Sequence, residues 1–372
     1  MRASESVQIH KSKTQELGSS LIGVFKGMGD LLSAAPVVIS ELDAGLKVVL
    51  LVFPAVGKIV DLIDWGEHSR NLNVLTFPAK TGVKSALVFL RRMAGLSPSF
   101  VWISPHAPRA ARSLKVPLCF WIFKLFYWRD AKLAGVDSER MSRLFDMHVP
   151  VDRNLPLEIR EWTAYAMLRR CRGGASPQAR FRPSVERNRL LTPLFDILIH
   201  PGANADNRKW PVEHFVELIT LLPSSCRVGL VGLPADIEGI RSSLPDNERV
   251  QCVVGSLEEA IIGIARTRVL LSMDSGTTFF AKALRVPTIA LYGPVDPVTV
   301  INPDEGGVLP IYERRWACQP CGDSRCRYSV NYCMRAIEPE RVARELLRLL
   351  QGLDQKVPIM IPVDEERHAS DR

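Results

Sequence analysis

Two segments in the C-terminal half of the chain combine small, hydroxyl-bearing and cationic residues in a pattern that suits an anionic ligand. The first follows the apolar run 196–200, and its candidate binding residues are Gly202, Ala203, Asn204 and Lys209. A glycine-bearing turn at the carboxyl end of a parallel strand lets backbone N–H groups approach a phosphate, and a lysine adds a mobile positive charge. An ordinary strand-to-helix turn, with Trp210 as packing and Pro211 in the first helical turn, explains these residues equally well.

The second segment follows the apolar run 269–273 and precedes an expected helix. Its candidate residues are Asp274, Ser275, Gly276, Thr277 and Thr278, with Lys282 further along the helix. Free N–H groups at the helix start, the helix dipole and nearby hydroxyls all favour a phosphate there. Alternatively, Asp274 or Ser275 only caps the helix. Two such turns at one sheet edge favour a binding site over two caps.

A third turn, Gly27-Met28-Gly29-Asp30, follows the first apolar run. It resembles the start of a dinucleotide fingerprint, but the third glycine is missing. The second expected strand also ends at Val52-Phe53-Pro54, without the acidic residue that would bind a ribose. A nicotinamide enzyme is therefore disfavoured. Asp30 is either a carboxylate that faces a cleft between domains, where it could act as a general base, or a simple helix cap.

Short apolar runs alternate with amphipathic stretches along the chain, which is typical of βαβ units around parallel sheets. The first half is expected to hold strands at 21–25, 47–53, 74–77 and 100–103 and helices at 31–42 and 83–94. The second half is expected to hold strands at 196–200, 227–232, 250–254, 269–273 and 288–292. Helices are expected at 211–222, 236–244 and 257–265, and from about residue 278. The sequence predicts an α/β protein with two doubly wound, Rossmann-like domains.

Composition divides the chain into parts of different character. They are an N-terminal extension at 1–20, a first domain at 21–170, a linker at 171–193, a second domain at 194–337, a C-terminal helix at 338–352 and a polar tail at 353–372. The linker is rich in Gly, Pro, Ser and Arg and lacks apolar periodicity. The C-terminal helix is expected to begin at Pro339 and to end at Gly352.

Length and charge bound the function. Of the 372 residues, 47% are hydrophobic and 24% are charged, which is globular composition at a length that favours two domains. The polar opening is unlike a secretory signal, and no apolar run reaches the roughly 20 residues that span a bilayer, so we expect a cytoplasmic protein. The formal net charge of +8 favours acidic partners. Nucleic acid is not expected among them, because its recognition motifs are missing.

Four of the eight cysteines are grouped. Their spacing is Cys318-x2-Cys321-x4-Cys326-x6-Cys333. Four thiolates in so short a segment can surround one structural zinc or iron ion. Free buried thiols and local disulfides are the alternatives, and a catalytic metal is disfavoured.

The segment 116–129 is dense in aromatic side chains with interspersed cations. This composition suits a helix that lies at a membrane interface with its rings at headgroup level. A helix in the core of the first domain explains the same residues and is the favoured interpretation.

Taken in order, the motifs resemble those of a known family. They are His200-Pro201-Gly202 with Lys209-Trp210-Pro211, then Asp274-Ser275-Gly276, then Tyr292-Gly293-Pro294 with Asp296-Pro297. This order resembles glycosyltransferase family 9, the ADP-heptose:lipopolysaccharide heptosyltransferases. Gly29-Asp30 followed by Pro36 is similar to the family's first loop, and the resemblance runs from about residue 21 to residue 350.

The resemblance implies a GT-B fold and an inverting sugar transfer without a catalytic metal. Asp30 would be the general base, while Lys209 and the loop 274–278 would hold the diphosphate of a sugar nucleotide, with ADP-heptose as the expected donor. The implied acceptor is a lipopolysaccharide-core or related lipid-linked glycan, with peripheral contact to the inner membrane. The alternatives are a protein acceptor such as an autotransporter adhesin, which the cysteine cluster supports, and a non-catalytic sugar-nucleotide-binding protein.

One residue departs from the family pattern. Phe279 stands where the family usually carries a histidine near the diphosphate, three residues after the motif glycine. The loss of this imidazole bears on donor identity and activity. Lys282 is the candidate substitute.

Overall fold

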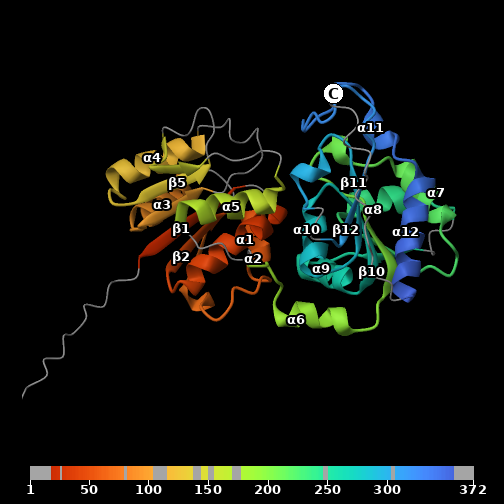
Figure 1. Ribbon diagram of the computed structural model, residues 1–372, viewed down its shortest axis with the longest axis horizontal. Helices are drawn as coiled ribbons and strands as arrows, with labels where there is room; N and C mark the ends of the chain where they lie inside the picture. Colours follow the sequence, from red (N-terminus) through yellow and green to blue (C-terminus); the bar gives the residue numbers. More distant parts are fainter. Residues whose placement is uncertain are drawn as a thin grey trace, which may run out of the picture.

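The computed structural model describes residues 18–25, 27–78, 82–103, 115–136, 144–149, 155–169, 177–245, 250–302 and 306–355. Most of the predicted N-terminal extension and polar tail, and the start of the predicted linker, lie outside these residues. Two six-stranded sheets lie side by side, each between layers of helices, and the segment around α6 (Pro183–Glu186) crosses from one to the other (Figure 1). The predicted α/β class with two Rossmann-like domains is confirmed.

The first sheet carries the N-terminal domain. Its strands are β1 (Ser19–Val24), β2 (Lys47–Val52), β3 (Leu72–Thr76), β4 (Phe100–Ile103), β5 (Lys132–Val136) and β6 (Met147–Val149). Its helices are α1 (Met28–Asp43), α2 (Pro54–Val60), α3 (Val83–Ala94), α4 (Lys115–Phe126) and α5 (Leu157–Arg169). The apolar residues of α1, α2 and α5 bury one face of the sheet, and those of α3 and α4 bury the other. Burial on both faces explains why the strands are rich in Val, Ile and Leu.

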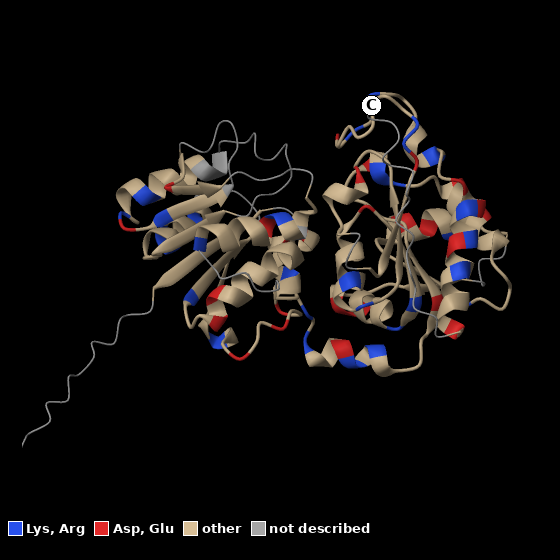
Figure 2. Ribbon diagram, viewed as in Figure 1, with Lys and Arg blue, Asp and Glu red and all other residues tan. Residues whose placement is uncertain are grey.

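The second sheet carries the C-terminal domain. Its strands are β7 (Phe195–His200), β8 (Val228–Val231), β9 (Val250–Val253), β10 (Thr267–Met273), β11 (Thr288–Tyr292) and β12 (Val308–Tyr312). Its helices are α7 (Val212–Leu221), α8 (Pro234–Arg241), α9 (Leu257–Ala265), α10 (Gly276–Ala283), α11 (Tyr332–Arg335) and α12 (Pro339–Asp354). Helices α7, α8 and α12 cover one face, and α9 and α10 cover the other. The outward side of α12 carries charges of both signs, as expected of a solvated helix (Figure 2).

Both sheets have the same strand order. It is β3-β2-β1-β4-β5-β6 in the first sheet and β12-β11-β10-β7-β8-β9 in the second, and the strand pairs are parallel. In each sheet the order reverses between the first and fourth strands, β1 and β4 or β7 and β10. The carboxyl ends of the strands at such a reversal point form the crevice where doubly wound folds bind ligands.

Several element boundaries differ from the predictions. The C-terminal helix does not end at Gly352 but continues to Asp354, because Leu346, Leu349 and Leu350 anchor it on the sheet and outweigh the low helix propensity of one glycine. The predicted linker is not without structure. It contains α6, and Phe181 and Val185, apolar residues within a polar stretch, are both buried.

The two domains share an apolar junction. One continuous cluster of buried residues includes Leu31 and Leu32 of α1 and Phe279 and Phe280 of α10. Phe181, which precedes α6, packs edge-on against Phe280 with ring centroids 6.1 Å apart. The relative position of the domains is therefore fixed by side-chain packing as well as by the connecting segment.

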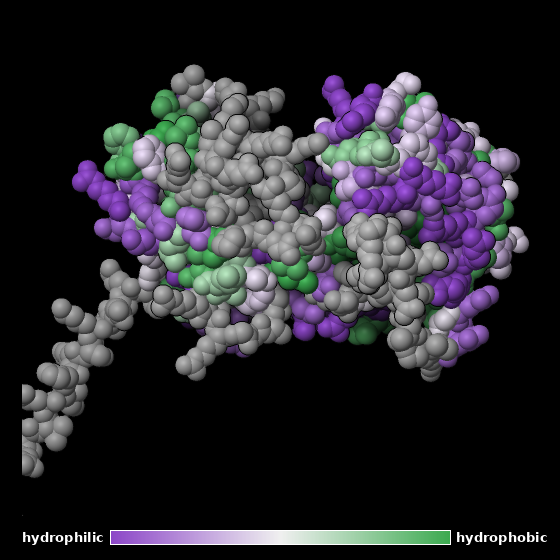
Figure 3. Space-filling view, turned by 45° about the horizontal axis from the view of Figure 1, so that its top comes forward, coloured by the Kyte–Doolittle hydropathy of each residue, from purple (hydrophilic) through white to green (hydrophobic). Residues whose placement is uncertain are grey.

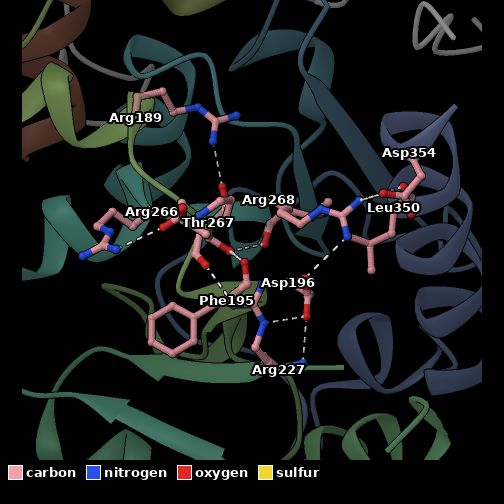
Figure 4. Close-up of polar contacts among 12 residues, drawn as sticks. Arg189, Phe195, Asp196, Arg227, Arg266, Thr267, Arg268, Leu350 and Asp354 are labelled. Carbon is pink, nitrogen blue, oxygen red and sulfur yellow. Dashed lines mark hydrogen bonds and ion pairs between the residues drawn. The ribbon is translucent and has the colours of Figure 1, made fainter. Parts of the chain in front are cut away.

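A polar cluster fastens α12 under the second sheet (Figure 4). Asp196 at the start of β7 accepts hydrogen bonds from Arg227 Nε at 3.1 Å and Nη2 at 3.0 Å. Arg268 of β10 pairs with the same carboxylate and donates to Asp354 and to the carbonyl of Leu350 in α12. These contacts lie at the amino ends of the strands, away from the expected ligand crevice.

In the first domain, a buried carboxylate joins α1 to α5 and to β1. Glu41 of α1 is 1% exposed and accepts from Tyr165 Oη at 2.6 Å, from Arg169 Nε and Nη2 at 2.8 Å, and from Ser20. Burial and the Glu41 charge raise the pKa of Tyr165, so its hydroxyl remains a donor. We expect Glu41→Ala to lower the free energy of unfolding by about 3 kcal/mol, because Arg169 and Tyr165 lose their acceptor. Urea unfolding measures this free energy, and Glu41→Gln should lower it by less than Glu41→Ala does. Equal losses in the two variants would show that the hydrogen bonds to residue 41 do not stabilise the fold.

Candidate functional site

The two predicted anion-binding segments meet at the reversal point of the second sheet. Strands β7 and β10 are neighbours, with Ser272 in register with His200, so the loops after them start side by side. Ser275 Oγ lies 3.2 Å from Ser272 Oγ and 3.5 Å from His200 Nδ1. Parallel pairing thus brings together two loops that are more than sixty residues apart in the sequence.

The start of α10 has no side-chain cap. Ser275 is the N-cap residue in an extended conformation, but its side chain makes no capping hydrogen bond. The Asp274 backbone N–H is used by the Leu291 carbonyl, and the Thr278 hydroxyl donates to the Met273 carbonyl at 3.3 Å. Ser275 is therefore not a side-chain cap. The Thr278 N–H donates to the Ser275 carbonyl at 3.3 Å, so the N–H groups of Gly276 and Thr277 are the candidates to face an anion.

Asp274 forms an ion pair that the sequence analysis missed. Its side chain is 8% exposed, and Oδ2 lies 3.0 Å from Nη1 of Arg208, without the angle of a hydrogen bond. Burial raises the pKa of Asp274, Arg208 opposes this, and Asp30 in the other domain adds to it. Arg208 thus compensates the negative charge of a buried carboxylate next to the N-terminus of α10. The Arg208-Lys209 pair was visible in the sequence, but its partners were not.

Lys209 is held in place by acidic neighbours. Its ammonium donates to Asp236 at 2.9 Å and lies 3.7 Å from Asp206. The hydrogen bond from Lys209 to Asp236 is the largest of the contacts that raise the pKa of Lys209, so the side chain stays cationic. Asp236, at the start of α8, is a second site residue that the sequence analysis did not single out. It holds the Lys209 ammonium by this hydrogen bond, while 36% of the Lys209 side chain stays exposed.

Close packing explains why the first loop contains glycine and other small residues. A Cβ on Gly202 would lie 3.2 Å from Asp236 Oδ2 and 3.3 Å from His200 Cε1. Ala203 packs against the core of the second domain. Asn204 reaches toward the first domain, since a Cβ on Gly27 would lie 3.9 Å from its Nδ2. The loop therefore links the second-domain crevice to the start of α1.

Asp30 lies where the two domains meet. It caps α1, because Oδ2 accepts from the Gly27 backbone N–H at 2.7 Å. It also lies close enough to Asp274 for its charge to raise the pKa of that carboxyl. The hydrogen bond confirms the capping interpretation, while the role of Asp30 as a general base stays a prediction.

Two glycines let the helices approach closely. A Cβ on Gly29 would lie 3.2 Å from Gly276 Cα and 2.8 Å from Cδ2 of Phe279. A Cβ on Gly276 would lie 3.2 Å from the Gly29 nitrogen. The starts of α1 and α10 thus touch through backbone, which places Asp30 beside the mouth of α10.

Phe279 and Lys282 lie farther along α10. Phe279 is 8% exposed and belongs to the apolar junction between the domains. Together with Lys282, Pro36 and Arg285 it lines a cavity of about 880 Å³ bounded by the connecting segment. Lys282 lies six residues after Gly276, a rise of roughly 9 Å along the helix. Its role as a substitute for the family histidine stays a prediction.

His200 is a neutral residue under the site. Burial lowers its pKa to about 4, although Asp236 opposes the shift. Between pH 6.5 and pH 4 the unfolded chain binds a proton at this position that the folded chain does not, so stability falls as the pH falls through this window. We expect a loss of about 3 kcal/mol from this residue. Urea unfolding between pH 6.5 and pH 4 should show a smaller loss of stability in His200→Gln than in the wild type. The same dependence of stability on pH in both proteins would contradict a lowered pKa for His200.

The cysteine segment is bound to the site loops. Gln319 Nε2 donates to the Gly293 carbonyl at 2.8 Å, and Asn331 Nδ2 donates to the Asn207 carbonyl at 2.7 Å. Gly293 itself has no room for a side chain, because a Cβ would lie 2.6 Å from the sulfur of Met334. The segment thus braces the loops that follow β7 and β11.

The four grouped thiols form no disulfide in the structure. Burial and the neighbouring Cys321 and Cys326 raise the pKa of Cys333 to about 11. Across the part of the chain that the structure describes, no three His, Cys, Asp or Glu residues form a group that could hold a metal ion. The structural zinc or iron ion at Cys318, Cys321, Cys326 and Cys333 stays a prediction.

Comparison with known proteins identifies the family that the chain resembles. Residues 173–327 match the family model "Glycosyltransferase family 9 (heptosyltransferase)", and this region contains both loops and most of the cysteine segment. This part of the chain is heptosyltransferase-like and resembles glycosyltransferase family 9. The family resemblance predicted from the motifs is confirmed.

Relatives in sequence match part of the length of this chain. It is 31% identical over 160 residues to the lipooligosaccharide heptosyltransferase 2 of Haemophilus influenzae, covering 40% of this chain and 46% of that protein. It is 35% identical over 106 residues to the lipopolysaccharide heptosyltransferase 2 of Salmonella typhimurium, covering 26% and 30%. The chain thus aligns in sequence with less than half of each of these relatives.

Solved structures resemble the chain over nearly its full length. The ADP-heptose lps heptosyltransferase II of E. coli has a TM-score of 0.63 at 18% identity and covers 91% of this chain and 100% of its own. The E. coli heptosyltransferase WaaC with ADP has a TM-score of 0.60 at 17% identity, with 91% and 99% covered. The iron-containing glycosyltransferase TibC of enterotoxigenic E. coli has a TM-score of 0.55 at 13% identity, with 92% and 78% covered. These likenesses establish the GT-B fold.

Proposed function

We propose that the protein is an inverting glycosyltransferase that transfers a sugar from a nucleotide diphosphate sugar. The observation that carries the proposal is the meeting of an uncapped helix start, an oriented lysine and a carboxylate from the opposite domain at one crevice. ADP-heptose is the proposed donor, because the relatives with matching sequence are heptosyltransferases and the WaaC structure contains ADP. A lipopolysaccharide-core or related lipid-linked glycan at the inner membrane is the proposed acceptor.

In this mechanism the second domain holds the leaving group. The N–H groups of Gly276 and Thr277, the Ser275 hydroxyl and the Lys209 ammonium surround the donor diphosphate. Negative charge builds on the diphosphate as the bond to the anomeric carbon breaks, and fixed donors that need no reorganisation stabilise it. Arg208 keeps Asp274 from adding an uncompensated negative charge beside this group.

The first domain supplies the base. Asp30 takes the proton from an acceptor hydroxyl while its oxygen attacks the anomeric carbon from the face opposite the diphosphate. The new glycosidic bond forms as the bond to the nucleoside diphosphate breaks, so the configuration inverts. Because α1 touches α10 through Gly29 and Gly276, this step requires both domains in contact.

A panel of sugar nucleotides tests the function. The protein is incubated with ADP-heptose, UDP-glucose or GDP-mannose and either a heptose-deficient lipopolysaccharide core or an unglycosylated adhesin fragment, and products are detected by mass spectrometry. We expect heptose transfer to the core. Transfer only to the adhesin fragment would replace the acceptor, and nucleotide binding without transfer or hydrolysis in any combination would contradict an enzymatic role.

Lys209 gives a sharper test of the donor site. We expect Lys209→Ala to weaken ADP binding by roughly tenfold, because an oriented cation is lost from the diphosphate. Isothermal titration at low salt measures the change. Lys282→Ala is the matched control on α10: unchanged ADP affinity would remove Lys282 from the donor site, whereas an unchanged affinity in Lys209→Ala would contradict the proposed placement of the diphosphate.

A further inference from the structure

Helices α3 and α4 present apolar side chains on their outer sides. These exposed residues are Leu87, Val88 and Leu90 on α3 and Leu118, Trp121, Ile122, Leu125, Phe126 and the adjoining Tyr127 on α4. We refer to them as the α3–α4 face. Phe126 is 69% exposed and Val88 is 61% exposed. Figure 3 shows hydrophobic surface gathered at the end of the first domain, whereas the second domain is largely hydrophilic on this side.

The inner sides of the same helices already fill the core. Phe120, Trp128 and Met93 are buried, and Trp128 Nε1 donates to the Met93 carbonyl at 3.2 Å, which fastens the end of α4 to α3. The favoured prediction that residues 116–129 form a core helix is therefore only half right. The segment buries one side and leaves the larger number of its aromatic and aliphatic side chains exposed.

The charge on these helices has one sign. Neither α3 nor α4 contains Asp or Glu, whereas α3 carries exposed Lys84, Arg91 and Arg92. No ion pair joins these three cations to any residue that the structure describes. Lys124 of α4 pairs with Asp146, and exposed Arg129 follows α4. An apolar face bordered by the cations of α3 is complementary to a bilayer surface, which has anionic headgroups above an apolar interior.

We propose that the α3–α4 face docks on the surface of an anionic phospholipid bilayer. Trp121 and Tyr127 lie at headgroup level, Leu125 and Phe126 enter the acyl boundary, and the α3 cations contact lipid phosphates. Twelve-residue α4 is about 18 Å long, too short to cross the bilayer, so it lies along the surface. No helix among the described residues is long and apolar enough to span a membrane.

Membrane docking would also bring the enzyme to its acceptor. This part of the inference rests on the proposed function. Helices α1, α3 and α4 follow β1, β3 and β4, which are parallel members of one sheet. All three helices therefore start at the same sheet edge, where Asp30 lies. Docking through α3 and α4 holds the first domain, which carries Asp30, at the bilayer, where a lipid-anchored acceptor presents its sugar.

Vesicle cosedimentation tests the docking. The full chain is mixed with vesicles of equal parts phosphatidylglycerol and phosphatidylcholine, and with pure phosphatidylcholine vesicles. We expect binding to the anionic vesicles, weakened by salt. Leu125→Ser/Phe126→Ser should lower the partition coefficient at least tenfold, about the loss expected for two apolar anchors. Arg91→Glu/Arg92→Glu should remove the preference for phosphatidylglycerol.

The control removes exposed apolar side chains elsewhere. Leu190→Ser/Leu191→Ser changes two side chains that are 86% and 52% exposed in the connecting segment, and it should bind vesicles like the wild type. Failure of the wild type to bind vesicles, or an equal loss in the control, would overturn the proposal. So would a wild-type dimer that becomes monomeric in Leu125→Ser/Phe126→Ser with no change in vesicle binding, because the face would then join two copies.

Different results would contradict the proposed glycosyltransferase function and the proposed membrane docking. Transfer to a delipidated, water-soluble core oligosaccharide should be unchanged in Leu125→Ser/Phe126→Ser, while transfer to acceptor embedded in vesicles should fall at least tenfold, in step with docking. Vesicle binding without transfer to any acceptor would leave the docking intact and contradict the proposed function. Transfer to vesicle-embedded acceptor that is the same in wild type and variant would support the function and overturn the docking role.

Discussion

Replacing Asp30 by asparagine should lower sugar transfer by about 100-fold or more while ADP binds with wild-type affinity. The substitution removes the proton acceptor but keeps an oxygen that can accept from the Gly27 N–H, so the cap of α1 survives. The nucleotide is held by loops of the second domain and does not depend on this carboxylate. Transfer is followed by mass spectrometry and ADP affinity by titration calorimetry.

The control for this experiment is the stability of the variant. Asp30→Asn should unfold at the same urea concentration as the wild type, whereas Asp30→Ala, which loses the cap, should lose about 1 kcal/mol. Retained transfer in a folded Asp30→Asn protein would rule out the carboxylate as the base. Lost transfer accompanied by lost ADP affinity would show that Asp30 supports the donor site instead.

Adding one methyl group at Gly29 should have the second largest effect. The new Cβ would lie 2.8 Å from the Phe279 ring and 3.2 Å from Gly276 Cα, so α1 and α10 must move apart. A shift of the base by about 1 Å can cost about 100-fold in rate. We expect Gly29→Ala to reduce transfer by this order and to leave ADP affinity unchanged.

A matched glycine and a second-site change sharpen the test. Gly57→Ala in α2 meets no atom closer than 3.8 Å and should transfer sugar at the wild-type rate. Phe279→Ala removes the closer of the two obstacles and should restore part of the activity of Gly29→Ala. Wild-type transfer in Gly29→Ala would show that the close helix contact is not needed for the reaction.

The elements that the sequence predicts best are those with strong local signals. Helix α9 has the predicted bounds, since Ser256 and Glu259 form a capping box at its start. Strand β12 was not predicted, because Pro310 lies inside it and a proline argues against a strand. It is an edge strand, where the missing N–H costs no ladder hydrogen bond. Strand β6 has three residues, too few for a periodic signal.

The position of the two site loops could be predicted from the sequence, but the partners of their side chains could not. The two loops could be placed at one edge because parallel strands end there, and the structure brings them together at β7 and β10. The pairing of Arg208 with Asp274 and of Lys209 with Asp236 depends on distances between separate segments, which no motif contains. The same holds for the outward face of α4, because an even spread of apolar residues does not show which side a helix buries.

Hydrogen–deuterium exchange with and without ADP tests where the nucleotide binds. The proposed position of its diphosphate is between the loop after β7 and the start of α10. We expect saturating ADP to slow backbone exchange in residues 200–209 and 274–278, because the N–H groups at the start of α10 become hydrogen-bond donors to phosphate. Unchanged exchange in both segments, or slowing confined to the first domain, would contradict the account.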